Sequence, residues 1–238
     1  QEEQDAAWNT YVMVTKEPLK DIFSEDLKLP ESLGIYLEDL LEEWEDVRQG
    51  AQVTVGTLMS QYYSRNETLC VPVLEISDAE EKPQIGGFCV LFGLQPMGEL
   101  SLREGEQLML LQNNLKRYAF TMQNGTRFLL EQVQTEREIT AAVDEAGNQY
   151  PVLTVTVRGN STVSALSWDA DQEDQRQQGK QELADRLLTF LTTQQKEAGM
   201  DLANSFLLLA GQERSLWEQY REEPAQYLSD LKIRLFVE

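Results

Sequence analysis

The sequence predicts an α+β fold of more than one domain, in which long helices pack on one face of an antiparallel or mixed sheet in the C-terminal domain. Three observations support this class. An apolar strand at 88–92 leads into a helix, alternating strands fill 117–168, and helices over 172–221 precede one last strand. This order is typical of helices layered on an antiparallel sheet. The 238 residues, 41% of them hydrophobic, suffice for one large core or two smaller ones.

The first third of the chain is predicted to contain short elements around one longer helix. We expect a strand at 11–15, a short helix at 18–23, a helix at 57–64 and a strand at 71–76. The longer helix is the clearest, because six apolar residues recur at helical spacing: Leu33, Leu37, Leu40, Leu41, Trp44 and Val47. Gly50 follows its end, where glycine is favoured. The charged, proline-containing run 77–83 predicts a surface linker.

A strand, a turn and a helix are predicted within the stretch 85–112. A glycine pair precedes the apolar strand Phe88–Phe92, and a Gly/Pro-rich turn contains a second apolar step at 97–100. Ser101 and Glu104 then have the spacing of a capping box, in which each side chain binds a backbone N–H at the start of a helix.

The middle of the chain predicts an antiparallel meander. Strands at 117–122 and 128–134 flank Asn124-Gly125, which is a strong hairpin signal. Strands at 139–143 and 150–158 flank a second turn. Gly159-Asn160 is expected to turn the chain into a further strand at 161–168.

Three helices and a strand are predicted to complete the chain. A long helix over 172–198 is expected to end at Gly199, and its apolar stripe consists of Leu183, Leu187, Phe190 and Leu191. Helices at 201–209 and 213–221 follow, and Pro224 is expected to close this block. The final strand is recognised from alternating apolar residues: Leu231, Ile233, Leu235 and Val237.

Composition limits the classes of function. The formal charge is −21, from 41 acidic against 20 basic residues. It argues against nucleic acid and anionic lipid heads, since both are bound by clustered Lys and Arg. A hydrated acidic surface explains the charge, and a basic partner is the alternative. The lack of histidine excludes His-based triads and His-ligated metals, whereas carboxylate or lysine chemistry stays open.

The sequence gives no motif for a catalytic, cofactor-binding or metal site. Asp169, Asp171 and Glu173 imitate a calcium loop, but its sixth and twelfth positions lack the required glycine and glutamate. The adjacent acids Glu42 and Glu43 are explained more simply as a solvated helix face. We therefore expect no catalytic residue, no cofactor and no metal.

Cysteines and hydropathy bear on the compartment. Cys70 and Cys89 lie in neighbouring strands, where they are expected to be two buried free thiols, or a disulfide if the protein is extracytoplasmic. Residues 1–10 lack the features of a signal peptide, which predicts a cytosolic protein or a trimmed mature fragment. The longest apolar runs, 88–92 and 206–210, are far shorter than a membrane span.

Two separate segments carry a family resemblance. The first combines Pro72–Ile76, a charged spacer, the strand Gly87–Phe92 with the turn Gly98-Glu99-Leu100, and the leucine-rich helix Glu104–Leu111. It resembles the second domain of the C subunits of spore germinant receptors, the Ger(x)C lipoproteins. There a proline-apolar strand, a glycine-led strand, a turn and a Glu-led helix follow one another.

The same family's ending resembles the last part of the chain. The matching features are Gln195-Lys196-Glu197 in a long helix, Asp201 at the next helix, Leu216-Trp217-Glu218 and the terminal strand. Tyr11–Lys16 with Lys20-Asp21-Ile22 also resembles a strand and step late in the family's first domain. The likeness therefore spans nearly the whole chain.

The resemblance implies three domains. Residues 1–76 would be the remainder of an N-terminal α/β domain, and 77–115 a small middle domain of strands and one helix. Residues 116–238 would form an antiparallel sheet with three helices and a returning strand. The family's signal peptide and most of its first domain would be missing.

The resemblance also implies a function. The chain would be a non-enzymatic extracytoplasmic subunit of a nutrient germinant receptor that supports receptor assembly and spore germination. Its partners would be the membrane-embedded A and B subunits. A lipid anchor that this chain does not contain would tether the full-length protein to the outer face of the spore inner membrane.

Two other interpretations remain open at this point. One is an acidic extracytoplasmic or cytosolic adaptor domain that binds a basic protein. The other is a hydrolase without histidine, which requires two carboxylates at catalytic separation in a cleft. Among contact residues, the aromatics Trp168 and Tyr220 near element ends are candidates, although core packing is the simpler explanation of each.

Overall fold

The computed structural model describes residues 8–23, 29, 31–48, 53–64, 68–77, 79, 81–92, 94–164, 172–196 and 198–238. Gly50, Trp168, Asp169 and Asp171 lie outside these residues, as do the side chains of Glu42, Glu43, Trp44 and Val47 within a described helix. The chain divides into two compact units, Gln1–Glu106 and Gln107–Glu238. The predicted α+β class is confirmed, with mixed sheets and helices in both units.

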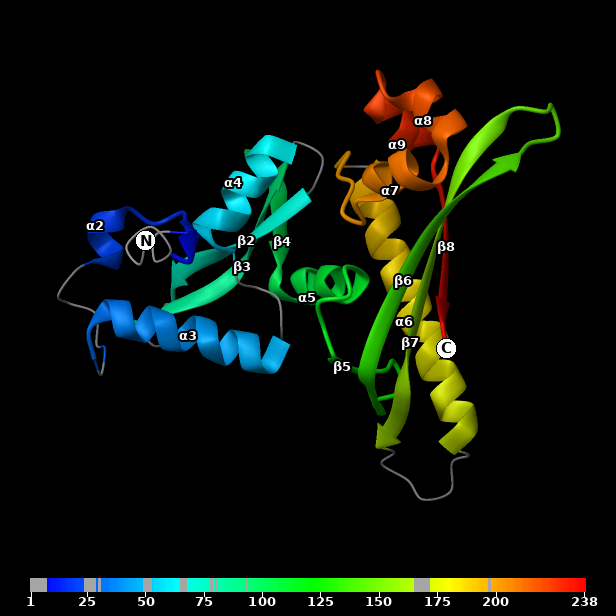
Figure 1. Ribbon diagram of the computed structural model, residues 1–238. Coiled ribbons are helices and arrows are strands. Elements are labelled where there is room, and N and C mark those ends of the chain that lie inside the picture. The colour runs from blue at the N-terminus through cyan, green and yellow to red at the C-terminus, as the bar shows by residue number, and fades with distance from the viewer. Residues whose placement is uncertain are drawn as a thin grey trace. The chain divides into compact units, whose positions relative to one another are not determined.

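The first unit is built on a mixed four-stranded sheet in the order β1-β2-β3-β4, covered by helices (Figure 1). The strands are β1 (Val14–Thr15), β2 (Thr68–Ile76), β3 (Pro83–Phe92) and β4 (Gln95–Ser101). The helices are α2 (Leu19–Ile22), α3 (Leu33–Arg48), α4 (Val55–Ser64) and α5 (Leu102–Leu111). β1 runs parallel to β2, and the other neighbouring pairs are antiparallel.

Helices cover both faces of this sheet, which explains why β2 and β3 are apolar along most of their length. On one face, Leu58 of α4 packs against the buried Leu69 and Val71. On the other, the ring of Phe88 lies against Gly105 of α5, where an added Cβ would come within 2.1 Å of it. Figure 1 shows α3 and α4 on opposite sides of the strands.

The predicted capping box is confirmed at the start of α5. The Ser101 backbone N–H donates to Glu104 Oε2 at 2.8 Å, and the Glu104 N–H donates back to Ser101 Oγ at 3.4 Å. Both bonds satisfy N–H groups at a helix start.

The run 77–83 connects two neighbours of one sheet. Ser77 N–H donates to the carbonyl of Lys82 at 2.9 Å, and β2 pairs directly with β3. The predicted domain boundaries at 76/77 and 115/116 stay predictions. The division into two compact units falls in the sequence between Glu106 and Gln107.

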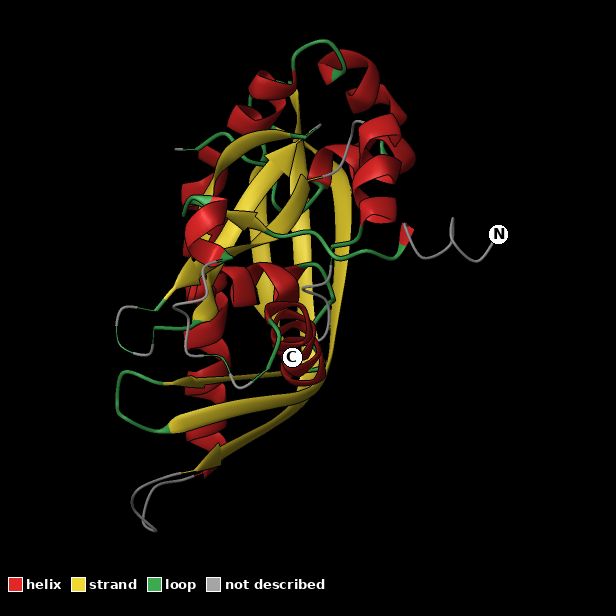
Figure 2. Ribbon diagram, turned by 90° about the vertical axis from the view of Figure 1, so that its left-hand side faces the viewer, coloured by secondary structure: helices red, strands yellow, loops and turns green. Residues whose placement is uncertain are grey.

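The second unit is a four-stranded sheet in the order β5-β6-β7-β8 with a helical layer (Figure 2). The strands are β5 (Arg117–Thr121), β6 (Arg127–Val143), β7 (Gln149–Ser164) and β8 (Lys232–Val237). The helices are α6 (Gln172–Lys196), α7 (Ser205–Gln212), α8 (Arg214–Tyr220) and α9 (Pro224–Asp230). β8 returns parallel to β7, so the sheet is mixed.

The predicted chain reversal at Gly159-Asn160 is wrong, because this pair lies within the continuous strand β7. The predicted strands at 128–134 and 139–143 likewise belong to one strand, β6. The register shifts between Glu131 and Gln134, where Gln132 adopts a positive φ of 53°. Gly159 lies beside this bulge, and an added Cβ would stand 2.8 Å from the Glu131 carbonyl oxygen. Glycine is required here by the close approach of the facing backbone.

The bulge keeps the buried apolar residues of β6 on one face of the strand. Before it, Phe128 and Leu130 are buried, and after it Val133 and Ile139 are buried. Without the extra residue, strict alternation would place these two sets on opposite faces. The apolar stripe of α6 is buried as predicted: Leu183, Leu187, Phe190 and Leu191. The guanidinium carbon of Arg186, also in α6, lies 4.4 Å from the centroid of the Phe120 ring in β5.

Two helix boundaries differ from the prediction. The predicted helix at 201–209 begins only at Ser205, as α7. Asp201 lies before it, and the Asp201 carboxylate accepts hydrogen bonds from the start of the helix. Pro224 begins a helix, α9, and does not only end the previous one. Proline is favoured at a first helical position, where its missing N–H has no intrahelical partner to lose. Gly199, with φ of 64°, ends α6 as predicted.

A pair of helical glycines tests the packing of α6 on the sheet. Gly179→Ala would place a Cβ 2.2 Å from the Phe128 ring, whereas Gly211→Ala in α7 meets nothing within 4 Å. We expect Gly179→Ala to lower the free energy of unfolding by about 1–3 kcal/mol through overpacking. Gly211→Ala should be neutral or stabilising by up to about 1 kcal/mol. Urea unfolding measures both, and equal effects would contradict this packing.

Candidate functional site

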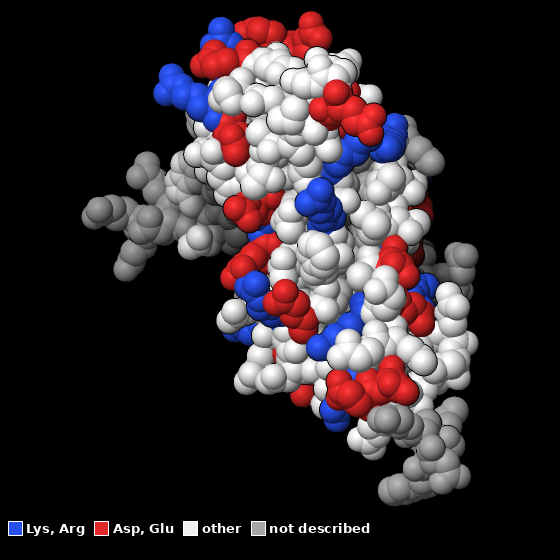
Figure 3. All heavy atoms as spheres, turned by 90° about the vertical axis from the view of Figure 1, so that its right-hand side faces the viewer, with Lys and Arg blue, Asp and Glu red and all other residues white. Residues whose placement is uncertain are grey.

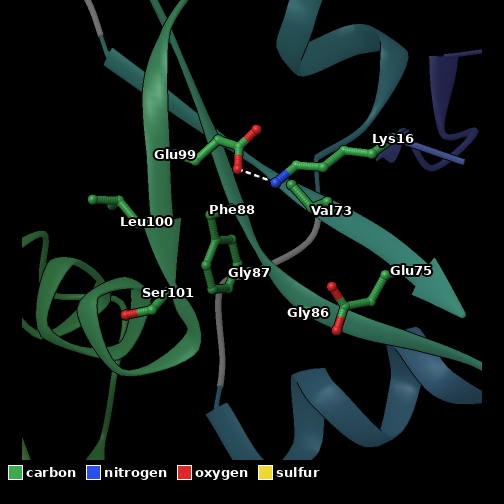
Figure 4. A pocket seen from close by; sticks show the side chains of 9 residues that line it. All are labelled: Lys16, Val73, Glu75, Gly86, Gly87, Phe88, Glu99, Leu100 and Ser101. Atoms are coloured by element: carbon green, nitrogen blue, oxygen red, sulfur yellow. Dashed lines mark hydrogen bonds and ion pairs between the residues drawn. The ribbon is translucent and has the colours of Figure 1, made fainter. Parts of the chain in front are cut away.

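The described residues of the first unit form a polar cavity on one face of its sheet. Its volume is about 290 Å³, and Figure 4 shows the nine side chains and glycines around it. One lining residue directly follows β1, and the others lie in β2, β3 and β4. They are Lys16, Val73, Glu75, Gly86, Gly87, Phe88, Glu99, Leu100 and Ser101. The site therefore depends on the pairing of all four strands.

Lys16 reaches across this face of the sheet to Glu99. Lys16 directly follows β1 at one edge, and Glu99 lies in β4 at the other edge. Their side chains form an ion pair, which raises the pKa of Lys16 through its hydrogen bond with Glu99 (Figure 4). Both side chains are more than half exposed, so the pair contributes little to stability. Its relevance is the placement of an ammonium group above the strands.

The glycine pair of β3 forms the floor of the cavity. A Cβ on Gly86 would lie 2.0 Å from the Glu75 carboxyl carbon, so this carboxylate occupies the space that a side chain at 86 would fill. A Cβ on Gly87 would lie 2.5 Å from the backbone oxygen of Leu100. The register shifts beside this pair, since Gly87 faces Val73 while Ile85 faces the next residue of β2. Glycine therefore serves two purposes here, close strand approach and an open cavity.

The chemistry of the cavity favours recognition of charge. Glu75 Oε1 accepts a hydrogen bond from Gln84 Nε2 at 2.9 Å, and Glu99 pairs with Lys16. Ser101 Oγ donates to Glu104, which belongs to the capping box. Two carboxylates and one ammonium thus line a small space with a backbone floor. Such groups can bind a polar ligand, but here each of them bonds to a neighbouring side chain of the fold.

The two cysteines flank this region without forming a disulfide. Cys70 pairs in register with Val90, and Cys89 pairs with Val71. Adjacent residues of a strand point to opposite faces, so the two thiols lie on opposite faces of the sheet. Both thiols are free, as the first expectation had it, but each cysteine is only partly buried and not fully buried as expected. Burial raises the pKa of the Cys70 thiol to about 12 and also raises that of Cys89.

A second polar cluster lies in the helical block of the other unit. Asp201 accepts hydrogen bonds from Ser205 N–H at 2.9 Å, Ser205 Oγ at 2.7 Å and Phe206 N–H at 2.7 Å. Burial raises the pKa of this carboxyl group, and the nearby Arg137 opposes that change. Arg137 Nη1 in turn donates to the Ala203 carbonyl at 2.8 Å. The cluster holds the start of α7 and docks it on β6.

Tyr220 is a core residue, which agrees with the simpler explanation of it. It is 3% exposed, and its hydroxyl donates to Asp230 Oδ2 at 2.9 Å. Its ring contacts that of Tyr227, at a centroid distance of 5.8 Å. Trp217, one of the residues in the family resemblance, packs at 4.8 Å from the ring of Phe206. These aromatics join α7, α8 and α9.

Sequence reasoning named neither the cavity nor its ion pair. Lys16 and Glu99 are 83 positions apart, so no local pattern links them. The glycine pair was visible as the start of a strand, yet nothing in the sequence shows that Glu75 lies above Gly86. Within the part of the chain that the structure describes, no three His, Cys, Asp or Glu residues are grouped to hold a metal ion.

Figure 3 shows acidic and basic side chains interspersed on the face in view, without one continuous basic area. Among the helices of the described residues, none has the length and apolar character needed to span a membrane.

Comparisons with known proteins give one family match, over the first third of the chain, and one solved structure with a similar fold. Residues 1–76 match the family described as the spore germination protein N-terminal domain. The solved structure titled "Crystal Structure of the GerBC protein" matches with a TM-score of 0.71 and 12% sequence identity, over 95% of this chain and 67% of that chain. No curated protein matches the chain.

The chain is therefore an α+β protein with the fold of the GerBC structure, and its first 76 residues are similar to the spore germination protein N-terminal domain. The predicted resemblance to the C subunits of spore germinant receptors is confirmed by these two findings.

The two glycines of the cavity floor are expected to differ in their tolerance of alanine. Gly87→Ala drives a Cβ against the Leu100 backbone and should lower the free energy of unfolding by about 1–3 kcal/mol. Gly86→Ala meets only the end of the flexible Glu75 side chain, which can turn away. Its effect should be clearly smaller. Urea unfolding of both variants is the measurement, and a larger loss for Gly86→Ala would refute this account of the floor.

Removal of the Asp201 carboxylate is expected to destabilise the second unit. Asp201→Ala leaves the N–H groups of Ser205 and Phe206 without their acceptor and Arg137 without a nearby opposite charge. The free energy of unfolding should fall by about 1–2 kcal/mol. Asp185→Ala, an exposed site on α6, is the matched control and should change it by less than about 0.5 kcal/mol. Thermal unfolding of both variants measures these changes, and equal losses of stability would contradict the role of Asp201.

Proposed function

We propose that this chain is the extracytoplasmic portion of a C subunit of a spore germinant receptor. The observation that carries the proposal is the fold match to the GerBC structure over 95% of the chain. The match of residues 1–76 of this chain to the spore germination protein N-terminal domain supports it. In this proposal the subunit works with membrane-embedded A and B subunits. A lipid anchor holds the full-length protein at the outer face of the spore inner membrane.

The proposed role is non-enzymatic support of receptor assembly. The polar clusters of both units support it, because their groups are engaged in structural bonds. Asp201 holds a helix start, Ser101 and Glu104 cap α5, and Lys16 pairs with Glu99. A general acid or base needs a side chain positioned toward a substrate, with a pKa suited to its task. The described clusters instead join strands and helices.

An acidic adaptor that binds a basic protein is the second candidate, and the charge distribution along the chain favours a basic partner. Residues 1–106 contain 22 acidic and 7 basic residues, whereas residues 107–238 contain 19 and 13. The first unit therefore carries most of the negative charge, which suits a basic partner through long-range attraction. Both candidates share this feature, because a receptor subunit can also present an acidic surface to its partners.

The test uses spores that produce the full-length protein as their sole subunit of this kind. Its gene is replaced by the wild-type, Asp201→Ala or Asp185→Ala form, and nutrient-triggered germination is followed by the fall in optical density. We expect A and B subunits to co-purify with wild-type protein from spore membranes. Asp201→Ala should reduce germination and co-purification together through loss of folded protein, whereas Asp185→Ala should not.

Two outcomes would contradict the receptor proposal. One is unchanged germination after deletion of the gene in such a strain. The other is full-length protein that co-purifies with a soluble basic protein and with neither membrane subunit, which would support the adaptor candidate.

A further inference from the structure

We propose that the outer edge of β8 is a docking site for an extended acidic segment of a partner protein. β8 is the last strand of its sheet and pairs with β7 alone among the described strands. Figure 1 shows it in red beside β7, with no strand beyond it. An edge strand presents N–H and C=O groups with which a further strand can pair, and proteins bind extended peptides in this way.

The hydrogen bonds to β7 show which backbone groups of β8 face outward. The Glu238 N–H donates to the Val157 carbonyl at 2.9 Å, so the groups of Glu238 and of every second residue before it point toward β7. Successive residues of a strand direct their N–H and C=O groups to opposite sides. Those of Ile233, Leu235 and Val237 therefore point away from β7, and nothing else in the described part of the chain bonds to them.

The half-buried side chains of β8 favour an apolar neighbour. Ile233, Leu235 and Val237 are half-buried and lie in register with three buried residues of β7. α6 contacts both strands, so this is the face of the sheet that the helix covers. A strand added beyond β8 would extend the covered face, and every second side chain of that strand would lie beside α6. Apolar residues therefore suit these alternate positions of the partner.

The solvent face of β8 favours carboxylates at the other positions of the partner. Lys232 and Arg234 are exposed on this face, and neither forms an ion pair within the described residues. The nearby Arg158, in contrast, pairs with two glutamates. Phe236, 51% exposed, continues the same face. Because opposite charges on neighbouring strands stabilise their pairing, a segment with alternating acidic and apolar residues complements this edge.

A second copy of the chain fits this edge less well than a single segment does. α6 packs mainly along β8, so two β8 strands paired about a two-fold axis would bring two α6 helices to the same face. Neighbouring strands lie about 4.8 Å apart, whereas packed helices need about 8–10 Å between their axes. A single extended segment carries no such helix.

The inference does not rest on the receptor function, because it uses only the second unit. The test is amide hydrogen exchange of the full chain, labelled with ¹⁵N, with and without the peptide acetyl-Thr-Val-Glu-Val-Glu-Val-amide. Antiparallel pairing places its two glutamates opposite the two cations of β8. We expect exchange at the amides of Ile233, Leu235 and Val237 to slow about tenfold once nine-tenths of the chain is bound. The amides of Arg234 and Phe236 point toward β7 and should change much less.

Control peptides and matched variants give the test its specificity. The peptide acetyl-Thr-Val-Glu-Pro-Glu-Val-amide lacks one N–H of the expected ladder and should not bind. A peptide with lysines in place of both glutamates should bind more weakly. Arg234→Gln should weaken binding of the acidic peptide by up to about fivefold. Arg214→Gln, at an exposed arginine of α8, is the control and should bind as the wild type does.

Any of four results overturns the proposal. Three of them are binding of the lysine peptide as tight as that of the acidic one, equal slowing at all five amides, and Arg234→Gln binding that equals that of Arg214→Gln. The fourth is slowing at the outward amides without peptide that increases with protein concentration, because a second copy would then occupy the edge. The dispersion of the amide spectrum shows whether each variant is folded, and Lys232→Gln replaces Arg234→Gln if the latter is not.

Discussion

The register of the β6–β7 ladder is the constraint on which the second unit depends. These strands pair from Arg127–Ser164 to Val143–Gln149, and the bulge at Gln132 keeps their buried residues on one face. A one-residue slip would turn the buried apolar side chains of β6 toward solvent. The α6 stripe packs on the face defined by this register, whereas β8 pairs in parallel with the edge of β7. Gly159 is required because two backbones approach closely at the bulge.

The same strand also explains how the helical block is attached. β5 pairs only with the first part of β6, so N–H groups farther along that edge need other acceptors. Thr135 N–H donates to Asn113 Oδ1 at 2.8 Å, and Ile139 N–H donates to Gln212 Oε1 at 2.7 Å. Arg137 binds the Ala203 carbonyl between them. Side chains thus take the place of a neighbouring strand, and they fix α7 to the sheet.

Local patterns in the sequence predicted most elements, because capping, periodicity and apolar runs act over a few residues. The capping box, α6 and β8 are examples, as is the end of α6 at Gly199. The errors arose where one local signal serves two structures. Gly159-Asn160 has turn composition but occupies a bulge, and Pro224 can follow one helix or begin another. The cavity was beyond prediction, since the Lys16–Glu99 pair depends on the order of four strands.

The two units differ in how they use polar side chains, and this bears on the proposed function. In the second unit, Asp201, Arg137 and Gln212 bind backbone groups and stiffen the fold. In the first unit, Lys16, Glu75 and Glu99 surround an open space over a glycine floor. Rigid binding of backbone groups suits a structural role, whereas exposed charges over a cavity suit exchange with an external partner.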